Sequence, residues 1–469
     1  MKLRPYQVDA VAKGSKFLIE NRKGAALMVL PTGSGKSIII AAIANDIPGN
    51  TLILQPSKEL LEQNYSKMCF YMGPENIGIY SASAGRKDFG KITFATIGSI
   101  INKKEEFSHF EQIIIDECHL VNSKGGMYEN LIKTLNVPVL GLTATPYRLY
   151  SYRDLQTDKL SVVAKFLHRT RPRIFEKIIH ITQIKELYSQ GYLSPIDYSR
   201  SIKGYDRSKI RLNSTGMDFD EESLMKYQAQ QNVIQKVKEC IENNDYKHIL
   251  VFCVSVLEAN QIAIELGYMG VACVSSNTKK ADRAEILGKF KSGEIKVVTN
   301  VGVLTTGFDF PELDCIILAR PTQSIALYYQ MLGRGIRIAP EKKQCYVIDI
   351  CGNVDKFGRI ETFEIVEPKS QLHRLKSDTS FLTGYDFFNE EDLEDSGYKD
   401  KVETQFKKNF SKEMTVITFG KFKGQKLSDV PDWYLKFILD KFDDGWVKDN
   451  FKKEMARRSS QSQSADLPF

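Results

Sequence analysis

Residues 30–37 read Leu-Pro-Thr-Gly-Ser-Gly-Lys-Ser, and this loop constrains the fold more than any other stretch of the chain. It joins the apolar run 25–30 to a second apolar run, 38–43, in the order of a buried strand, a glycine loop and a helix. Gly33 and Gly35 permit backbone angles that other residues avoid, so that N–H groups can converge on an anion at the start of the helix. The loop therefore predicts a phosphate-binding site at the end of a strand.

The side chains of this loop indicate a nucleotide triphosphate with magnesium. Lys36 would reach the β- and γ-phosphates, and the Ser37 hydroxyl would ligate Mg²⁺. Leu30 stands where the general pattern has glycine or alanine, and we interpret it as the end of the preceding strand. The rest of the cradle is expected from Thr32, Gly33, Ser34 and Gly35. ATP and Mg²⁺ are the predicted cofactors.

An acidic pair completes the predicted site. Asp116 and Glu117 directly follow the apolar run 113–115. Residues at the carboxyl end of a buried parallel strand lie over the crevice where ligands bind. We therefore predict that Asp116 holds Mg²⁺ and that Glu117 orients and deprotonates the attacking water.

Two sets of short apolar runs, separated by helical patterns, predict the fold. The first set lies within residues 1–146, and the second begins near residue 248. Near-continuous apolar strands are typical of parallel sheets that are buried on both faces, which indicates an α/β fold with two similar domains in tandem. We expect the first domain at 1–185, the second at 186–366, a linker at 367–412, a small C-terminal α+β module at 413–458 and a disordered tail at 459–469.

Composition adds broad limits. The 469 residues allow two or three domains, and the net charge of +7 is compatible with a polyanionic partner without requiring one. The sequence has no run of about 18 apolar residues and no signal-peptide pattern, so we expect a cytoplasmic protein with no membrane partner. The eight cysteines form no Cys-x-x-Cys pair, which favours buried thiols over disulfides or zinc ligands.

The region from about 147 to 204 is less regular and more basic than its surroundings, and two interpretations stay open. Basic residues among aromatic rings can bind a nucleic-acid backbone and stack bases. A solvated helical insertion with a few anchoring rings would have the same composition. The residues concerned are Arg148, Arg153, Lys165, Arg169, Arg171 and Arg173, among Tyr147, Tyr150, Tyr152 and Phe166.

A series of motifs in the first 365 or so residues resembles that of superfamily 2 helicases, which are DNA or RNA translocases with two RecA-like domains. Besides the phosphate loop, the motifs are Arg-Pro-Tyr-Gln at 4–7, Gln-Pro-Ser-Lys-Glu-Leu at 55–60, Thr-Ile-Gly-Ser at 96–99, Asp-Glu-Cys-His at 116–119, Thr-Ala-Thr at 143–145, the stretch 299–309 and Gln-Met-Leu-Gly-Arg-Gly-Ile-Arg at 330–337. The resemblance implies two tandem RecA-like domains that hydrolyse ATP between them.

The resemblance implies that the second domain supplies part of the ATP site. Arg334 and Arg337 are three residues apart, so one helical face could present both to the γ-phosphate held by the first domain. An arginine supplied across a cleft stabilises transition-state charge. The other second-domain residues expected at this interface are Gln330, Gly307 and Asp309.

The resemblance also implies roles for first-domain residues around the loop. Arg4 and Gln7 belong to the element that reads adenine, and an amide can both donate and accept a hydrogen bond, as the adenine edge requires. His119 is expected to bridge the acidic box to the second domain. Thr143 and Thr145 are expected to couple hydrolysis to the grip on nucleic acid, although they could simply end a strand.

Nucleic-acid contacts in such proteins are mostly to backbone phosphate, which makes them blind to sequence and sensitive to salt. Any single serine or threonine in these motifs could instead cap a helix. The candidates in the first domain are Ser57, Lys58, Thr96 and Ser99, and those in the second are Thr299 and Asn300.

The motif pattern resembles DNA-repair and phage branch-migration helicases, which implies unwinding or remodelling of forked or branched DNA. Single-stranded, forked or branched DNA is the expected partner, with further partners from replication or recombination. An RNA helicase, and the non-unwinding motor subunit of a restriction or defence complex, are the alternatives.

The C-terminal stretch 419–435 resembles a small domain appended to some nucleases and phage proteins. Two glycines at 420 and 424 predict a tight turn that presents Lys421 and Lys423, and we hypothesise that the turn grips duplex or forked DNA. The alternative is a packing module whose small core contains Trp433 and Tyr434.

Overall fold

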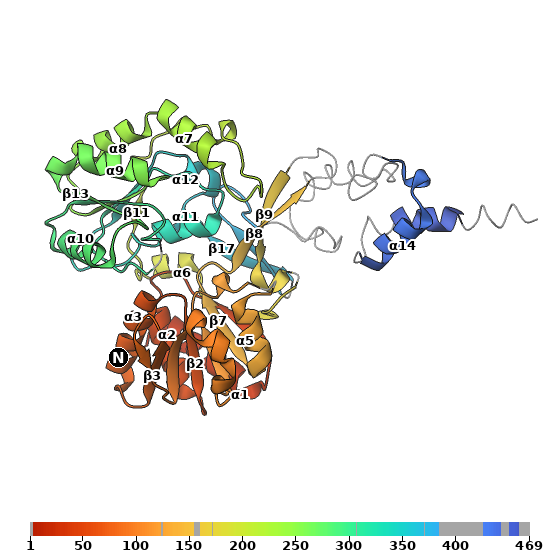
Figure 1. The fold of residues 1–469 in the computed structure, drawn as a ribbon. Coiled ribbons are helices and arrows are strands. Elements are labelled where there is room, and N and C mark those ends of the chain that lie inside the picture. The colour runs from red at the N-terminus through yellow and green to blue at the C-terminus, as the bar shows by residue number, and fades with distance from the viewer. Residues whose placement is uncertain are drawn as a thin grey trace, which may run out of the picture. The chain divides into compact units, whose positions relative to one another are not determined.

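Eight strands form the sheet of the N-terminal half, in the order β10-β1-β7-β6-β2-β5-β3-β4 (Figure 1). All pair in parallel except β4, which is antiparallel to β3. Every residue of β1, β2 and β7 is buried, as expected for a sheet covered on both faces. The bounds are β1 Ala25–Val29, β2 Thr51–Gln55, β3 Ile77–Ser81, β4 Arg86–Lys87, β5 Ile92–Thr96, β6 Gln112–Ile115, β7 Val139–Thr143 and β10 Lys177–Ile181.

Helices cover the two faces of this sheet because successive strand residues point to opposite sides. Met28 packs with α1 (Pro5–Glu20), α2 (Lys36–Asp46) and α3 (Lys58–Met72) in one buried cluster. Leu27, its neighbour in β1, belongs to a second cluster with residues of α4 (Ile97–Ile100) and α5 (Met127–Leu135). The alternation fixes which face of β1 each helix covers.

A second parallel sheet, in the order β11-β16-β15-β12-β14-β13, forms the other half. Its strands are β11 Ile196–Asp197, β12 Ile249–Phe252, β13 Val271–Val274, β14 Val297–Asn300, β15 Cys315–Leu318 and β16 Cys345–Asp349. Its helices are α7 Glu221–Gln230, α8 Val233–Glu242, α9 Val256–Glu265, α10 Lys280–Ser292, α11 Ile325–Leu332 and α12 Asn353–Phe357. Both sheets have the predicted α/β architecture, which confirms the predicted fold class.

One buried cluster continues from the first sheet into the second. It contains Leu27 and Ile113 of the first sheet and Leu250 and Ile316 of the second, together with Tyr328 of α11. The two halves therefore share a hydrophobic core, and side chains at their junction are held in place by packing from both sides.

The computed structural model describes residues 3–122, 125–153, 160–170, 172–305, 307–369, 371–383, 425–441 and 450–458. These ranges fall into two compact units, Met1–Ser151 with Val162–Gly384, and Tyr152–Ser161 with Tyr385–Phe469. Within the second unit, α14 (Asp432–Lys441) contributes Tyr434 and Leu435 to a small buried cluster, as the packing alternative for this module expects, while Trp433 is exposed. Lys421, Lys423, Arg171, the acidic stretch 389–395 and the predicted disordered tail lie outside the described residues.

The region from 147 onward forms strands that the sequence interpretation did not name. β8 (Tyr147–Arg153) and β9 (Leu160–Phe166) make a two-stranded sheet rather than a helical insertion, and β10 joins the first sheet beside β1. β17 (Glu364–Lys369) and β18 (Leu372–Lys376) form an antiparallel hairpin across the expected boundary at 366. Among the described residues, no helix combines the length and apolar character needed to cross a membrane.

Two glutamines fasten the β17–β18 hairpin to the first half of the chain. The Gln371 side chain accepts a hydrogen bond from Ile178 N (2.8 Å) and donates one to Ile178 O (3.2 Å), so the amide imitates a neighbouring strand on the edge of β10. The Gln183 side chain does the same for β17, donating to Ile365 O (2.7 Å) and accepting from Ile365 N (3.0 Å). The hairpin is therefore held by two reciprocal amide contacts.

We expect Gln371→Ala to lower stability, because it leaves the N–H and C=O of Ile178 without partners at a partly buried edge. The loss should be about 1–3 kcal/mol, seen as a lower denaturation midpoint. Gln235→Ala is the matched control, since Gln235 bonds only the exposed Glu239 on its own helix. Equal midpoints for the two variants would contradict the role given to Gln371.

Candidate active site

The phosphate loop adopts a left-handed backbone conformation, which favours glycine, at two positions. Gly33 and Gly35 both have φ of 81°, and α2 starts directly after Gly35. A Cβ built on Gly35 would lie 2.6 Å from Gln7 Nε2, and one on Gly33 would lie 2.9 Å from Leu193 Cδ2. Both glycines are therefore required by the backbone and by the side chains packed over the loop.

The N-terminal motif holds the loop by its backbone. Gln7 Nε2 and the Tyr6 hydroxyl both donate to Ser34 O, at 2.9 and 2.8 Å. Gln7 Oε1 accepts from Arg4 N at 2.9 Å, and the Arg4 guanidinium lies 4.3 Å from the ring centroid of Tyr192. The expected adenine-reading residues thus lie against the loop, and Tyr192, which the sequence analysis did not assign to the site, lies with them.

The acidic pair lies next to the loop lysine. Lys36 Nζ is 3.4 Å from Glu117 Oε1. Burial, with repulsion from Glu117, raises the pKa of Asp116 to about 6. Burial alone would raise the pKa of Glu117 as well, but the charge of Lys36 and the contact with His119 lower it to about 2. Glu117 therefore loses its proton at a lower pH than Asp116 does, and it occupies a left-handed backbone conformation with φ of 48°.

A side chain of α3 connects the two predicted magnesium ligands. Ser37 Oγ donates to Asn64 Oδ1 at 2.6 Å, and Asn64 Nδ2 donates to Asp116 Oδ2 at 3.0 Å. The sequence analysis did not identify Asn64, because nothing in its neighbourhood of the chain marks a contact with residues 27 and 52 positions away.

His119 lies at the centre of a network that joins the two halves. Its Nδ1 is 2.9 Å from Thr143 Oγ1 and 3.3 Å from Glu117 Oε2, and its Nε2 is 3.2 Å from Gln330 Nε2. With the Gln330 amide nitrogen as donor, His119 Nε2 accepts and the ring proton resides on Nδ1, where it faces Glu117 and Thr143. Thr143 Oγ1 also accepts from Thr145 N at 3.0 Å. The residues predicted to couple the site thus contact one another.

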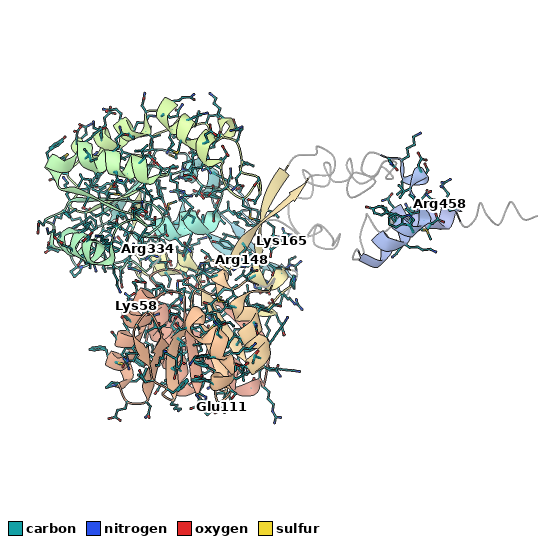
Figure 2. The ribbon with its side chains drawn as sticks, viewed as in Figure 1. Lys58, Glu111, Arg148, Lys165, Arg334 and Arg458 are labelled. Carbon is teal, nitrogen blue, oxygen red and sulfur yellow. The ribbon has the colours of Figure 1, made fainter. Side chains whose placement is uncertain are left out.

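Helix α11 ends at Leu332, so Arg334 and Arg337 follow the helix and do not share a helical face as the sequence analysis expects. Backbone carbonyls and a carboxylate from residues 305, 308 and 309 hold their side chains. Arg334 is 7% exposed and donates to Phe308 O (2.6 Å) and Thr305 O (2.8 Å). Burial lowers the pKa of Arg334 to about 9, so it remains charged at neutral pH. Arg337 forms an ion pair with Asp309. Figure 2 labels Arg334 in its half of the molecule near the junction with the other half.

Asp309 and Gly307 lie at the junction of the two halves, as the sequence analysis expects. Asp309 Oδ2 accepts from Gln63 Nε2 of α3 at 2.7 Å and lies 3.6 Å from Lys67 Nζ. A Cβ built on Gly307 would lie 3.7 Å from Leu60 Cγ. Helix α3 therefore contacts the second half through one carboxylate and through close packing.

Polar atoms at this junction that have no hydrogen-bond partner among the described residues suit a bound nucleotide and its metal. Within the described part of the chain, Ser34 Oγ, Thr145 Oγ1 and Arg334 Nε are buried without a hydrogen-bond partner. Buried polar groups normally have partners, so these atoms favour a polar ligand. The cations Lys36 and Arg334 suit phosphate oxygens, and Asp116 with the Ser37 hydroxyl supplies the oxygen donors that Mg²⁺ prefers.

The expected nucleic-acid residues of the first half form hydrogen bonds within the chain. Ser57 Oγ accepts from Leu60 N at 3.3 Å and caps α3, which agrees with the capping alternative. Lys58 Nζ donates to Ser83 O at 2.7 Å, and Thr96 Oγ1 and Ser99 Oγ are 2.8 Å apart. Lys58 also lies 3.3 Å from Glu62. These four side chains line one end of the sheet beside α3 and stay candidates.

Thr299 and Asn300 correct the prediction for the second half. Both are 0% exposed. Thr299 Oγ1 donates to Ala259 O at 2.9 Å, and Asn300 Nδ2 donates to Val251 O at 3.0 Å. These side chains satisfy carbonyl groups inside the second half, so neither can touch a backbone phosphate in this structure.

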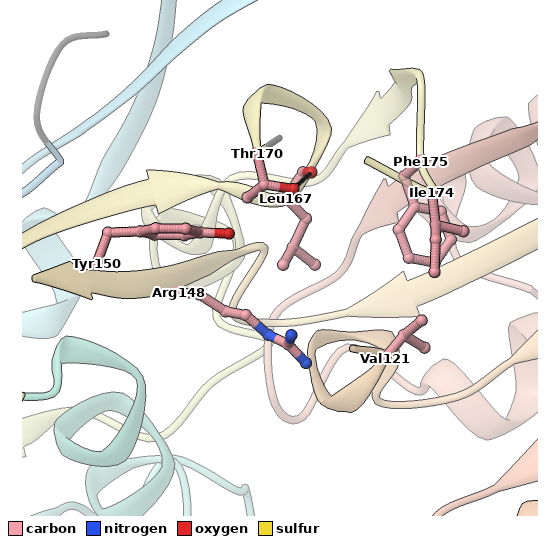
Figure 3. Close-up of a pocket in the computed structure, with 7 residues that line it drawn as sticks. All are labelled: Val121, Arg148, Tyr150, Leu167, Thr170, Ile174 and Phe175. Atoms are coloured by element: carbon pink, nitrogen blue, oxygen red, sulfur yellow. Dashed lines mark hydrogen bonds between the residues drawn. The ribbon is translucent and has the colours of Figure 1, made fainter. Parts of the chain in front are cut away.

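A small cavity behind the acidic box involves the basic region (Figure 3). It is lined by Val121, Arg148, Tyr150, Leu167, Thr170, Ile174 and Phe175, and its volume of about 10 Å³ suits about one water rather than a nucleotide. Arg148 Nε donates to His119 O at 2.6 Å, and Lys165 Nζ lies 5.8 Å from the Tyr150 ring centroid. These two basic residues make contacts within the fold.

Two family models match the chain in the order of its two sheets. The model described as "Type III restriction enzyme, res subunit" matches residues 1–148. The model described as "Helicase conserved C-terminal domain" matches residues 232–339. The first range contains the phosphate loop and the acidic box, and the second contains Arg334 and Arg337.

Two known proteins are similar to this chain over about three quarters of its length. The DNA 3′-5′ translocase XPB2 of Sulfurisphaera tokodaii is 27% identical over 383 residues, which cover 75% of this chain and 81% of the relative. IRC3 of Saccharomyces cerevisiae is 27% identical over 379 residues, which cover 75% of this chain but about half, 51%, of that protein.

One similar solved structure is that of the ATP-dependent Type ISP restriction-modification enzyme LlaBIII bound to DNA. It matches with a TM-score of 0.53 and 18% identity, and the match covers 74% of this chain and 28% of that one. This likeness shows the fold. The two matched family models and the similarity to the helicase IRC3 and the translocase XPB2 lead to one assignment: the chain belongs to the superfamily 2 helicases.

Proposed function

We propose that this chain is an ATP-dependent DNA helicase or translocase that unwinds or remodels forked or branched DNA. The observation that carries the proposal is the series of contacts from Lys36 through Glu117 and His119 to Gln330. It begins at the phosphate loop of the first half and ends in α11 of the second. A change at the phosphate end can therefore alter the contact between the halves, as a motor driven by hydrolysis requires.

Different residues around the loop would bind the phosphates, the metal and the rest of the nucleotide. Lys36 would hold the β- and γ-phosphates, while Ser37 and Asp116 would hold Mg²⁺. The bound Mg²⁺ neutralises phosphate charge. Arg4, Gln7, Thr32, Gly33, Ser34 and Gly35 would surround the rest of the nucleotide.

Glu117 is the proposed proton acceptor for the attacking water. In this structure burial raises the pKa of Glu117, but Lys36, which pairs with it, and His119 lower the pKa to about 2, which makes Glu117 a weak base. Once Lys36 turns to phosphate oxygens, Glu117 loses its nearest cation and its pKa rises. The lysine thus links nucleotide binding to the strength of the base.

Arg334 and Arg337 would complete the site from the second half. Arg334 has an unpartnered Nε and is held by two backbone carbonyls, which fix its guanidinium without neutralising it. Such an arginine can stabilise charge that develops on a transferred phosphoryl group. Closure on ATP and reopening after hydrolysis would then move the two halves along a strand.

DNA is the proposed partner because one relative is named as a DNA translocase and the solved structure of similar fold contains DNA. Ser57, Lys58, Thr96 and Ser99 are the proposed contacts to backbone phosphate. Such contacts carry no sequence information, so the preference for forks or junctions must come from the shape of the DNA.

One experiment tests the substrate directly. The purified chain is given forked duplexes, four-way junctions, duplexes with 3′ or 5′ tails, and matched RNA duplexes, and strand displacement is measured together with ATP hydrolysis. We expect displacement of forked or branched DNA only when ATP can be hydrolysed, and stronger stimulation of hydrolysis by DNA than by RNA. Reactions with a non-hydrolysable ATP analogue are the control.

Two other results would replace the proposal. Preferential stimulation and unwinding by RNA would make the chain an RNA helicase. DNA-stimulated hydrolysis with displacement of a bound protein roadblock, but without strand separation, would make it a translocating motor of the restriction-enzyme kind.

A further inference from the structure

Asn64 occupies a position between the two proposed Mg²⁺ ligands. Its side chain is 4% exposed and that of Asp116 is equally buried at 4%. Oδ1 accepts a hydrogen bond of 2.6 Å from Ser37 Oγ, and Nδ2 donates one of 3.0 Å to Asp116 Oδ2. The Asn64 amide thus accepts a hydrogen bond from Ser37 and donates one to Asp116.

The direction of these two hydrogen bonds matters for a metal. A serine that gives a lone pair to a cation keeps its proton, and that proton needs an acceptor. Asn64 Oδ1 is the acceptor here, so the lone pairs of Ser37 Oγ point away from Asn64. Asp116 accepts from Asn64 through Oδ2 and from Glu117 N through Oδ1 at 2.9 Å, which fixes the plane of its carboxylate.

We propose that Asn64 is a positioning residue of the Mg²⁺ site. It aligns the Ser37 lone pairs and the Asp116 carboxylate before the metal arrives. The inference rests on the proposed function, in which Ser37 and Asp116 hold the metal. Mutation of a group that orients a metal ligand by a hydrogen bond typically costs about 10–100-fold in metal affinity.

The helix that carries Asn64 is fixed at both sides of the site. The neighbouring Gln63 donates to Asp309 of the second half at 2.7 Å, and Ser57 caps the start of α3. The position of Asn64 relative to Ser37 is therefore set by the fold and by the junction between the halves. A polar residue with one donor and one acceptor at this point satisfies both ligands at once.

The test separates metal binding from nucleotide binding. A fluorescent ADP analogue is titrated into the full chain in excess EDTA and again in Mg²⁺, and the ratio of the two dissociation constants is compared between variants. For Asn64→Leu and Asn64→Ala we expect affinity in EDTA to stay within about twofold. The strengthening by Mg²⁺ should fall by about 10-fold. Thermal melting in EDTA checks that each variant folds, and the apolar Leu, which branches at Cγ as Asn does, serves if Ala does not.

Two companion variants make the result decisive. Ser66→Ala lies on the same helix, where Ser66 bonds only the Glu62 carbonyl, and should keep the wild-type ratio. Ser37→Ala should lose the effect of Mg²⁺ itself. If Ser37→Ala loses it while both Asn64 variants keep it, the inference is overturned. If Ser37→Ala also keeps it, the proposed metal site is wrong in the first place.

Discussion

Replacing Lys36 with alanine should reduce nucleic-acid-stimulated ATP hydrolysis by about 10³-fold or more, because the variant loses the cation aimed at the phosphates. The structure adds a second cause. Lys36 pairs with Glu117, whose side chain is 21% exposed, and removal of the lysine leaves that carboxylate without this ion pair. The pKa of Glu117 should then rise, so the proton acceptor changes as well as the phosphate contact.

The measurement is steady-state hydrolysis together with binding of a fluorescent ATP analogue. Lys13→Ala is the matched control, since Lys13 pairs with Asp9 on the exposed side of α1 and is 49% exposed. We expect hydrolysis by that control to equal the wild type. Near-normal hydrolysis by the Lys36 variant would refute the assignment of the phosphate site.

Arg334→Ala should lower kcat by about 10³-fold while changing nucleotide affinity much less. The loop that binds the phosphates belongs to the first half, so ground-state binding does not depend on Arg334. The transition state does, because the guanidinium is buried, charged and held at the junction by Thr305 O and Phe308 O. Within the described ranges, Arg334 forms no ion pair that would neutralise it.

Two further variants separate charge from geometry. Arg334→Lys keeps a cation but loses the planar fork that bonds two carbonyls, and we expect it to recover only a small part of the activity. Arg359→Ala removes a 52%-exposed arginine of the same half that pairs with Asp378, and should leave kcat unchanged. A proportional loss of kcat and of nucleotide affinity in Arg334→Ala would instead indicate damage to the whole site.

The parts of the site that were predictable are those specified by a short stretch of chain. The phosphate loop and the acidic box each follow a strand directly, so strand, turn and ligand are encoded together. Asn64 and Tyr192 reach the site only through the packing of α3 and of the second half, and the local sequence contains no sign of that packing. Their roles need the tertiary structure.

The strands of the fold were likewise predictable only where a short stretch of sequence specifies them. Runs such as 113–115 are wholly apolar and were interpreted as strands, which they are. β10 contains the polar residues Lys177 and His180, so its apolar pattern is weak, and its pairing with β1 makes it a strand. Thr299 was misjudged because a polar residue at the end of a strand can serve a ligand or a neighbouring carbonyl, and here it bonds Ala259 O.

The amide contact between Gln371 and Ile178 bears on how this protein can be divided. β10 is the outermost strand of its sheet, and an uncovered edge strand offers a template for pairing with another chain. The Gln371 side chain forms hydrogen bonds with both the N–H and the C=O of Ile178, so these groups cannot pair with a strand of another chain. A fragment that stops after Arg337 would contain every ATP-site residue named above and still expose this edge to self-association. The shortest well-behaved fragment should therefore extend through β18, to Lys376.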